Sequence, residues 1–199
     1  MRLFLLGMLF LSAVSVQARP ITDLRTYGKP AKTEMYVFTS ITCPHCKDFH
    51  QTIFPELLKK YVNKGQALIK MVDVVTDEKS MKAAMLMRCL PDDKAHRMMD
   101  WLYKNQDKII NSKAIDFLLL QYTQSLGMLN KDFDACLANK HLKEEIEEQR
   151  DLLLRLYQIR GWPAIAIQNG NSVKTYMGSN KRAVLNGIEH DLKEFRLAK

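Results

Sequence analysis

The sequence predicts an α/β domain that is interrupted by an inserted all-helical subdomain. Three observations carry this prediction: a strand–helix–strand pattern over residues 34–77, a block without strand pattern over residues 78–159, and a strand–strand–helix pattern over residues 160–199. A chain of 199 residues is long enough for one domain with an insertion, and its hydrophobic content of 47% can fill a sizeable core.

Residues 1–18 predict a cleaved secretory signal peptide. Arg2 gives the start a positive charge, residues 3–16 are nearly all apolar, and residues 16–18 place small or apolar side chains where a signal peptidase cuts. The apolar run is short for a membrane span, so an uncleaved anchor is the less favoured alternative. We therefore expect an exported chain that starts at Arg19 and has no stable membrane insertion.

The first half of the α/β domain follows a polar segment. Residues 19–33 contain two prolines and predict an irregular lead-in. Residues 34–40 are rich in β-branched and aromatic side chains, which is typical of a strand. Apolar residues then recur at helical spacing up to about Val62, with a break expected near Pro55. Residues 67–75 predict a second strand, parallel to the first.

The second half begins with helices and ends with a hairpin. Helical patterns cover residues 78–89, 92–105, 112–125, 131–138 and 140–159. Strand patterns then cover residues 163–168 and 172–177, on either side of the hairpin signal Asn169-Gly170. A closing helix is expected over residues 180–196.

The net charge of +8 does not indicate a nucleic-acid partner. Basic residues are spread along the predicted helices and form no cluster interleaved with aromatic residues. Together with export, this spread favours a solvated basic surface.

The motif Cys43-Pro44-His45-Cys46 lies between the first predicted strand and the first predicted helix. A cysteine at a helix N-terminus lies near unpaired backbone N–H groups, which stabilise a thiolate, and the thiolate is the reactive form. Cys43 is therefore the expected nucleophile, and Cys46, one turn further, the resolving cysteine. Pro44 stiffens the turn, and His45 is expected to stabilise the thiolate, with an exposed residue without a role as the alternative.

The other two cysteines bear on a competing interpretation, half of a zinc site. Zinc would need two further ligands, but Cys89 and Cys136 are far apart and form no second C-x-x-C motif. Cysteines of exported proteins usually pair, so Cys89 and Cys136 are the natural second disulfide, with two free thiols as the alternative. We expect neither a metal nor another cofactor.

Long runs of this chain resemble the DsbA family of periplasmic thiol:disulfide oxidoreductases. The similar runs are TSITCPHCKDFHQTIFPELLKKYVNKG, ALIKMVDV, KAAMLMRC, DFDACL and RGWPAIAIQNG. The resemblance implies a thioredoxin fold split by a helical insertion, and a location in the periplasm of a Gram-negative bacterium. It also implies that Pro163 is a cis-proline beside the dithiol, and that some relatives bridge the positions of Cys89 and Cys136.

The activity that the resemblance implies is the introduction of disulfide bonds into exported proteins. Reduced, unfolded exported proteins would be the substrates, with Trp162 and Pro44 as candidate contacts. A substrate thiolate would attack Cys43, a second substrate thiol would resolve the mixed disulfide, and a DsbB-like quinone-linked membrane oxidase would reoxidise Cys43 and Cys46.

Three positions depart from the family pattern. A buried acid often lies six residues before the first cysteine, where this chain has Val37. An acid often follows the motif, where this chain has His50, either a proton relay or a surface histidine. Trp162 replaces a small or β-branched residue before the proline, which bears on substrate range.

Two other functions stay open. The first is a disulfide isomerase or reductase, although known isomerases add a dimerisation module, for which residues 19–33 are too short. The second is a peptide-binding chaperone on a thioredoxin scaffold, against which the intact C-P-H-C motif argues.

Overall fold

A computed structural model of the chain describes residues 24–197. The predicted signal peptide of residues 1–18 and the expected start at Arg19 lie outside the described residues. Within residues 24–197, no helix is both long enough and apolar enough to cross a membrane.

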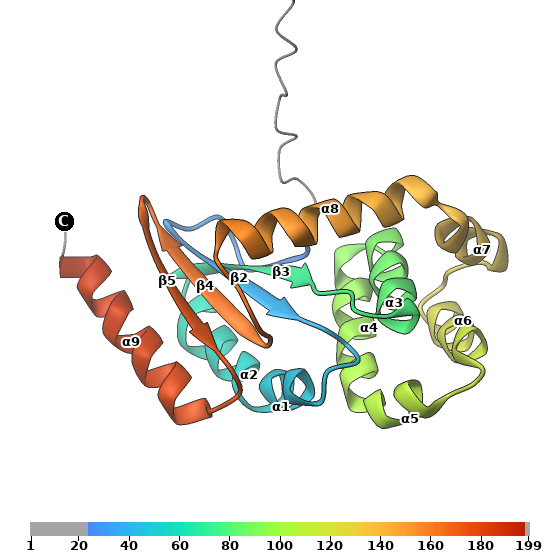
Figure 1. The fold of residues 1–199 in the computed structure, drawn as a ribbon, viewed down its shortest axis with the longest axis horizontal. Helices are drawn as coiled ribbons and strands as arrows, with labels where there is room; N and C mark the ends of the chain where they lie inside the picture. The colour runs from blue at the N-terminus through green and yellow to red at the C-terminus, as the bar shows by residue number, and fades with distance from the viewer. Residues whose placement is uncertain (1–23, 198–199) are drawn as a thin grey trace, which may run out of the picture.

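A five-stranded mixed sheet forms the centre of the α/β domain (Figure 1). Its strand order is β1-β3-β2-β4-β5, and only the β2–β3 pair is parallel. The strands are β1 (Thr26–Tyr27), β2 (Thr33–Thr39), β3 (Ala67–Asp73), β4 (Ala164–Asn169) and β5 (Ser172–Met177). The two longer predicted strands and the hairpin are therefore found where the sequence places them.

The crossover from β2 to β3 is helical but not continuous. It consists of α1 (Pro44–Thr52), α2 (Phe54–Leu57) and the π-helix η1 (Leu58–Val62). The break predicted near Pro55 lies at Ile53, so that Pro55 falls in the first turn of α2. A proline is tolerated there because the first N–H groups of a helix have no partner within the helix.

The segment between β3 and β4 contains helices and no strand. These helices are α3 (Glu78–Cys89), α4 (Asp92–Lys104), α5 (Gln106–Asn111), α6 (Ile115–Ser125), α7 (Asn130–Ala138) and α8 (Lys140–Leu156). The short helix α5 was not predicted, and the helix expected from residue 112 begins at Ile115. The closing helix is α9 (Lys181–Leu197).

The two faces of the sheet pack into two apolar clusters. Met35 and Val37 of β2 face the crossover helices and α9 in the larger cluster, which continues into the helical segment. Tyr36 and Phe38, which point to the opposite face, pack with Leu153 of α8. In Figure 1, α8 lies along the upper side of the sheet, and the helices from α3 to α7 lie beyond the right-hand end of the sheet.

The irregular lead-in predicted for residues 19–33 needs a correction, because β1 lies within it. Met71 donates its backbone N–H to the carbonyl of Arg25 at 2.8 Å, which starts the β1–β3 pairing. The Tyr27 ring packs against Phe54 and His96, with centroid distances of 5.0 and 3.8 Å. These partners are distant in sequence, so the local pattern contains no sign of the strand.

Candidate active site

Cys43 lies at the N-cap of α1, after the loop that follows β2. Its backbone is extended, and its carbonyl accepts hydrogen bonds from Cys46 N at 3.0 Å and Lys47 N at 3.2 Å. Pro44 occupies the first turn. The Cys43 side chain is therefore at the positive end of the helix, where negative charge on its sulfur is favoured.

The two sulfurs of the motif lie in different environments. Cys43 is partly accessible, whereas Cys46 is fully buried, and both carry free thiols in this structure. Burial raises the pKa of the Cys46 thiol, although the Ser40 N–H, 3.4 Å from Cys46 Sγ, acts in the opposite direction. Only Cys43 is thus placed for attack by an external thiol.

Pro163 immediately precedes β4 and follows Trp162, the residue that lies next to Cys43. The Trp162–Pro163 peptide bond is cis. The Cys43 thiol points at the Trp162 carbonyl oxygen, 3.9 Å from the sulfur. Trp162 is partly buried and packs against both apolar clusters. The fold thus brings Pro163 and Trp162 to the cysteine motif from more than a hundred residues away.

The two residues between the cysteines are both exposed. Within residues 24–197, the His45 ring has neither a hydrogen bond nor an ion pair. Pro44 and His45 therefore belong to the surface that an incoming molecule would meet. The stabilising role predicted for His45 stays a prediction.

Val37 and His50, which differ from the residues that the family usually has there, lie in different surroundings. Val37 is fully buried between Met71 of β3 and Ile165 of β4, so this position offers no proton donor or acceptor. The alternative of a surface histidine is wrong for His50, which is only 9% exposed. Its Nε2 lies 2.8 Å from Asp100 Oδ1, and its ring stacks on Tyr103 of α4.

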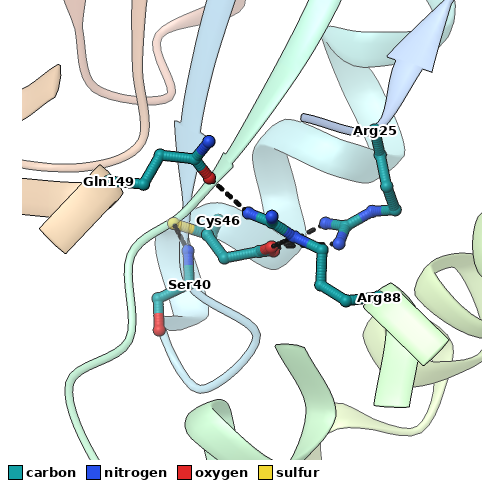
Figure 2. Close-up of polar contacts among 6 residues, drawn as sticks. Arg25, Ser40, Cys46, Arg88 and Gln149 are labelled. Atoms are coloured by element: carbon teal, nitrogen blue, oxygen red, sulfur yellow. Dashed lines mark hydrogen bonds and ion pairs between the residues drawn. The ribbon is translucent and has the colours of Figure 1, made fainter. Parts of the chain in front are cut away.

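A buried ion network that the sequence did not reveal lies where β1 and β3 meet the helical segment (Figure 2). Arg25 binds the Asp73 carboxylate with two hydrogen bonds of 2.9 and 2.6 Å, and Arg88 Nε lies 3.7 Å from the same group. Gln149 of α8 accepts a hydrogen bond from Arg88. Burial alone would raise the pKa of Asp73, but the two guanidiniums hold it below its usual range.

The helical segment also holds the loop before Cys43. Thr42 donates a hydrogen bond of 2.7 Å to Asp77, the N-cap of α3. Gln106 of α5 donates to the carbonyls of Ile41 and Cys43 at 2.8 and 2.9 Å. Sequence reasoning missed these contacts because they join residues between 35 and 65 positions apart.

The other two cysteines form a disulfide in the structure. Cys89, at the end of α3, and Cys136, in α7, are bonded with a Cα–Cα distance of 6.3 Å. Their sulfurs are therefore not free to join Cys43 and Cys46 around a metal ion. The disulfide links the C-terminal end of α3 to α7, whereas Asp77 caps the N-terminal end of α3.

Comparisons with known proteins cover most of the chain. The family model described as thioredoxin matches residues 22–181. A putative protein-disulfide oxidoreductase of Rickettsia typhi is 27% identical over 173 residues, which are 86% of this chain and 64% of the relative. The chain thus spans less than two thirds of that relative's length.

Solved structures with the same architecture were found as well. Wolbachia pipientis α-DsbA1 matches with a TM-score of 0.78 and 22% identity, over 90% of this chain and 96% of that one. BdbD from Bacillus subtilis matches with a TM-score of 0.72 and 21% identity, over 85% of this chain and 93% of that one. This likeness confirms the predicted fold, in which helices are inserted between the two halves of the α/β unit.

Proposed function

The chain belongs to the thioredoxin family, and from this premise we propose that it is a thiol:disulfide oxidoreductase that introduces disulfide bonds into exported proteins. One observation carries the proposal: a partly accessible Cys43 at the start of α1 is paired with a fully buried Cys46. Such a pair can accept an attacking thiolate at one sulfur and release the other into the protein. The disulfide-oxidoreductase relative supports the same class of reaction.

The reaction would start from the oxidised enzyme, with Cys43 and Cys46 joined. A substrate thiolate attacks Cys43 Sγ, a substrate–Cys43 bond forms, and the Cys43–Cys46 bond breaks. The second substrate thiolate then attacks the substrate sulfur and releases Cys43 as a thiolate. Two substrate thiols are thereby oxidised to a disulfide and the Cys43–Cys46 disulfide takes up the two electrons, while the two protons pass to the enzyme thiols or the surrounding water.

The leaving sulfur in the first step is that of Cys46. Its burial favours the protonated thiol, and Val37 offers no acid in the sheet beneath it. The Ser40 N–H, 3.4 Å away, can stabilise the anion as the bond breaks. Cys43 is released at the start of α1, where the helix dipole stabilises its negative charge. A protonated His45 would stabilise this thiolate further.

The substrate would be an unfolded chain with reduced cysteines. Exposed Pro44 and partly buried Trp162, whose carbonyl oxygen lies 3.9 Å from Cys43 Sγ, are the proposed contacts. Electrons would leave through a DsbB-like, quinone-linked membrane oxidase. The signal-peptide pattern of residues 1–18 and the Cys89–Cys136 disulfide support a periplasmic site of action.

The proposal is tested by oxidative refolding of reduced, denatured ribonuclease A with the purified, oxidised protein. We expect ribonuclease activity to return with the wild type and not with Cys43→Ser. Cys89→Ala/Cys136→Ala is the control, because it removes the other two cysteines but leaves the motif intact, and it should retain the activity. A wild type that restores no more activity than the C43S variant would overturn the proposal.

The direction of electron flow needs a second measurement. We expect Cys43 and Cys46 to be mainly oxidised in cells, so alkylation of free thiols after acid quenching should leave the mass of the protein unchanged. A dithiol that is mainly reduced in cells would instead favour an isomerase or reductase.

A further inference from the structure

One side chain of the helical segment reaches the cysteine motif from a helix that the sequence did not predict. Gln106, the first residue of α5, is 1% exposed. Its Nε2 donates one hydrogen bond to the carbonyl of Ile41 at 2.8 Å and one to the carbonyl of Cys43 at 2.9 Å. Both N–H groups of one amide are thus directed at the backbone on either side of Thr42.

The chemistry of the two acceptors fixes how this amide is oriented. Both are carbonyl oxygens, which only the NH2 group of Gln106 can face. The amide oxygen, Oε1, is then buried without a hydrogen-bond partner among residues 24–197. A buried oxygen without a partner costs free energy, and an apolar side chain of the same size would avoid that cost. The arrangement therefore points to a use for the two donors besides filling space.

Contacts at both ends of α5 hold Gln106 in place. Asp107 forms an ion pair of 2.7 Å with Lys47, which follows the cysteine motif in α1. At the other end, the Lys79 ammonium donates to the carbonyls of Ile109 and Ser112 at 3.3 and 3.0 Å. The amide is thus presented by a helix that is fixed to α1 on one side and to α3 on the other.

We propose that Gln106 is a positioning residue for the redox reaction of Cys43, an inference that rests on the proposed function. It holds the carbonyls of Ile41 and Cys43 while the sulfur of Cys43 changes from a neutral disulfide to an anion. The carbonyl oxygens are the negative ends of their dipoles, and the two amide N–H groups offset them beside the new charge. Loss of the donors therefore destabilises the reduced enzyme more than the oxidised one.

The test is the redox equilibrium of purified Gln106→Met with reduced and oxidised glutathione. Methionine keeps the length and volume but removes both donors. We expect the equilibrium constant for reduction of the Cys43–Cys46 disulfide to fall by about fivefold, the size of one typical hydrogen bond. Gln168→Met is the matched control, since its half-buried amide binds Tyr157 and Gly170, away from the motif. Its equilibrium constant should equal that of the wild type.

Gln106→Glu supplies a second readout that a purely structural role would not move. The introduced carboxylate has the same shape as the amide but offers no donor to the two carbonyls. The equilibrium constant for reduction of the disulfide in Q106E should therefore be lower than that of Q106M at pH 7. Acidification protonates the introduced carboxylate and restores one donor, so the ratio of variant to wild-type constants should rise towards one. This variant also serves if Q106M fails to fold.

The outcomes separate this inference from the function on which it rests. A wild type that neither refolds ribonuclease A nor equilibrates with glutathione would overturn the proposed function. A wild type that does both, with Q106M and Q106E at wild-type constants and altered only in their unfolding midpoints, would overturn the role of Gln106 alone.

Discussion

Removal of the Cys89–Cys136 disulfide gives a sharp prediction about stability. The bridge joins residues 47 positions apart, and closing a loop of that length in the unfolded chain is worth about 4 kcal/mol in the chain-entropy model. Cys89 is exposed and Cys136 is 4% exposed, so replacement by alanine removes little packing beyond the second sulfur. We expect Cys89→Ala/Cys136→Ala to lower the free energy of unfolding by about 3–4 kcal/mol.

The assay is equilibrium unfolding in urea, followed by circular dichroism, in a Cys43→Ala/Cys46→Ala background. This background prevents the reactive thiols from exchanging with the second disulfide. The unlinked unfolded chain exposes more surface, so the dependence of the free energy on urea should also become steeper. A loss below about 1 kcal/mol with an unchanged slope would refute the chain-entropy argument for this bridge.

Three further predictions concern single residues. Asp73→Asn should lower the free energy of unfolding by about 3 kcal/mol, because it leaves the buried Arg25 without its carboxylate. Because the pKa of Asp73 is lower in the folded protein than in the unfolded chain, its ionised carboxylate stabilises the wild type at pH values above the unfolded-state pKa of about 4. The free energy of unfolding should therefore fall as the pH drops below about 4, and it should fall less steeply in D73N. Urea unfolding from pH 3 to 7 measures both effects. In the reduced protein, iodoacetamide should modify Cys43 well before the buried Cys46, as peptide mass spectrometry would detect; equal rates would contradict the burial argument. His50→Ala should lower the thermal midpoint by several degrees, because it removes the ring stacked on Tyr103 and Phe54; an unchanged midpoint in calorimetry would contradict this.

The parts of the fold that could be predicted are those with a local signal. Alternating or β-branched runs marked β2, β3 and the β4–β5 hairpin, and apolar spacing marked α1 and α3. The hairpin turn at Gly170, which has a φ of +59°, follows from the Asn169-Gly170 pair itself. The position of Cys43 at the start of α1 follows in the same way from the strand before it and Pro44 after it.

The missed parts depend on partners that are distant in sequence. A six-residue helix such as α5 is not stable by itself, and here it is held by Lys79 and by the loop around Cys43. His50 lies at the edge of the apolar stripe of α1, so its burial depends on where α4 packs. The two-residue strand β1 is likewise defined by its pairing with β3.

The central claim is that Cys43 is the sulfur to which substrates become joined. The most direct test is to express the full chain with Cys46→Ala, which stops resolution within the enzyme, and to identify the mixed disulfides by mass spectrometry. We predict exported, cysteine-containing proteins bonded to Cys43, and none in the Cys43→Ala/Cys46→Ala variant. Adducts that persist in the double variant, or a C46A protein without adducts at Cys43, would contradict the account.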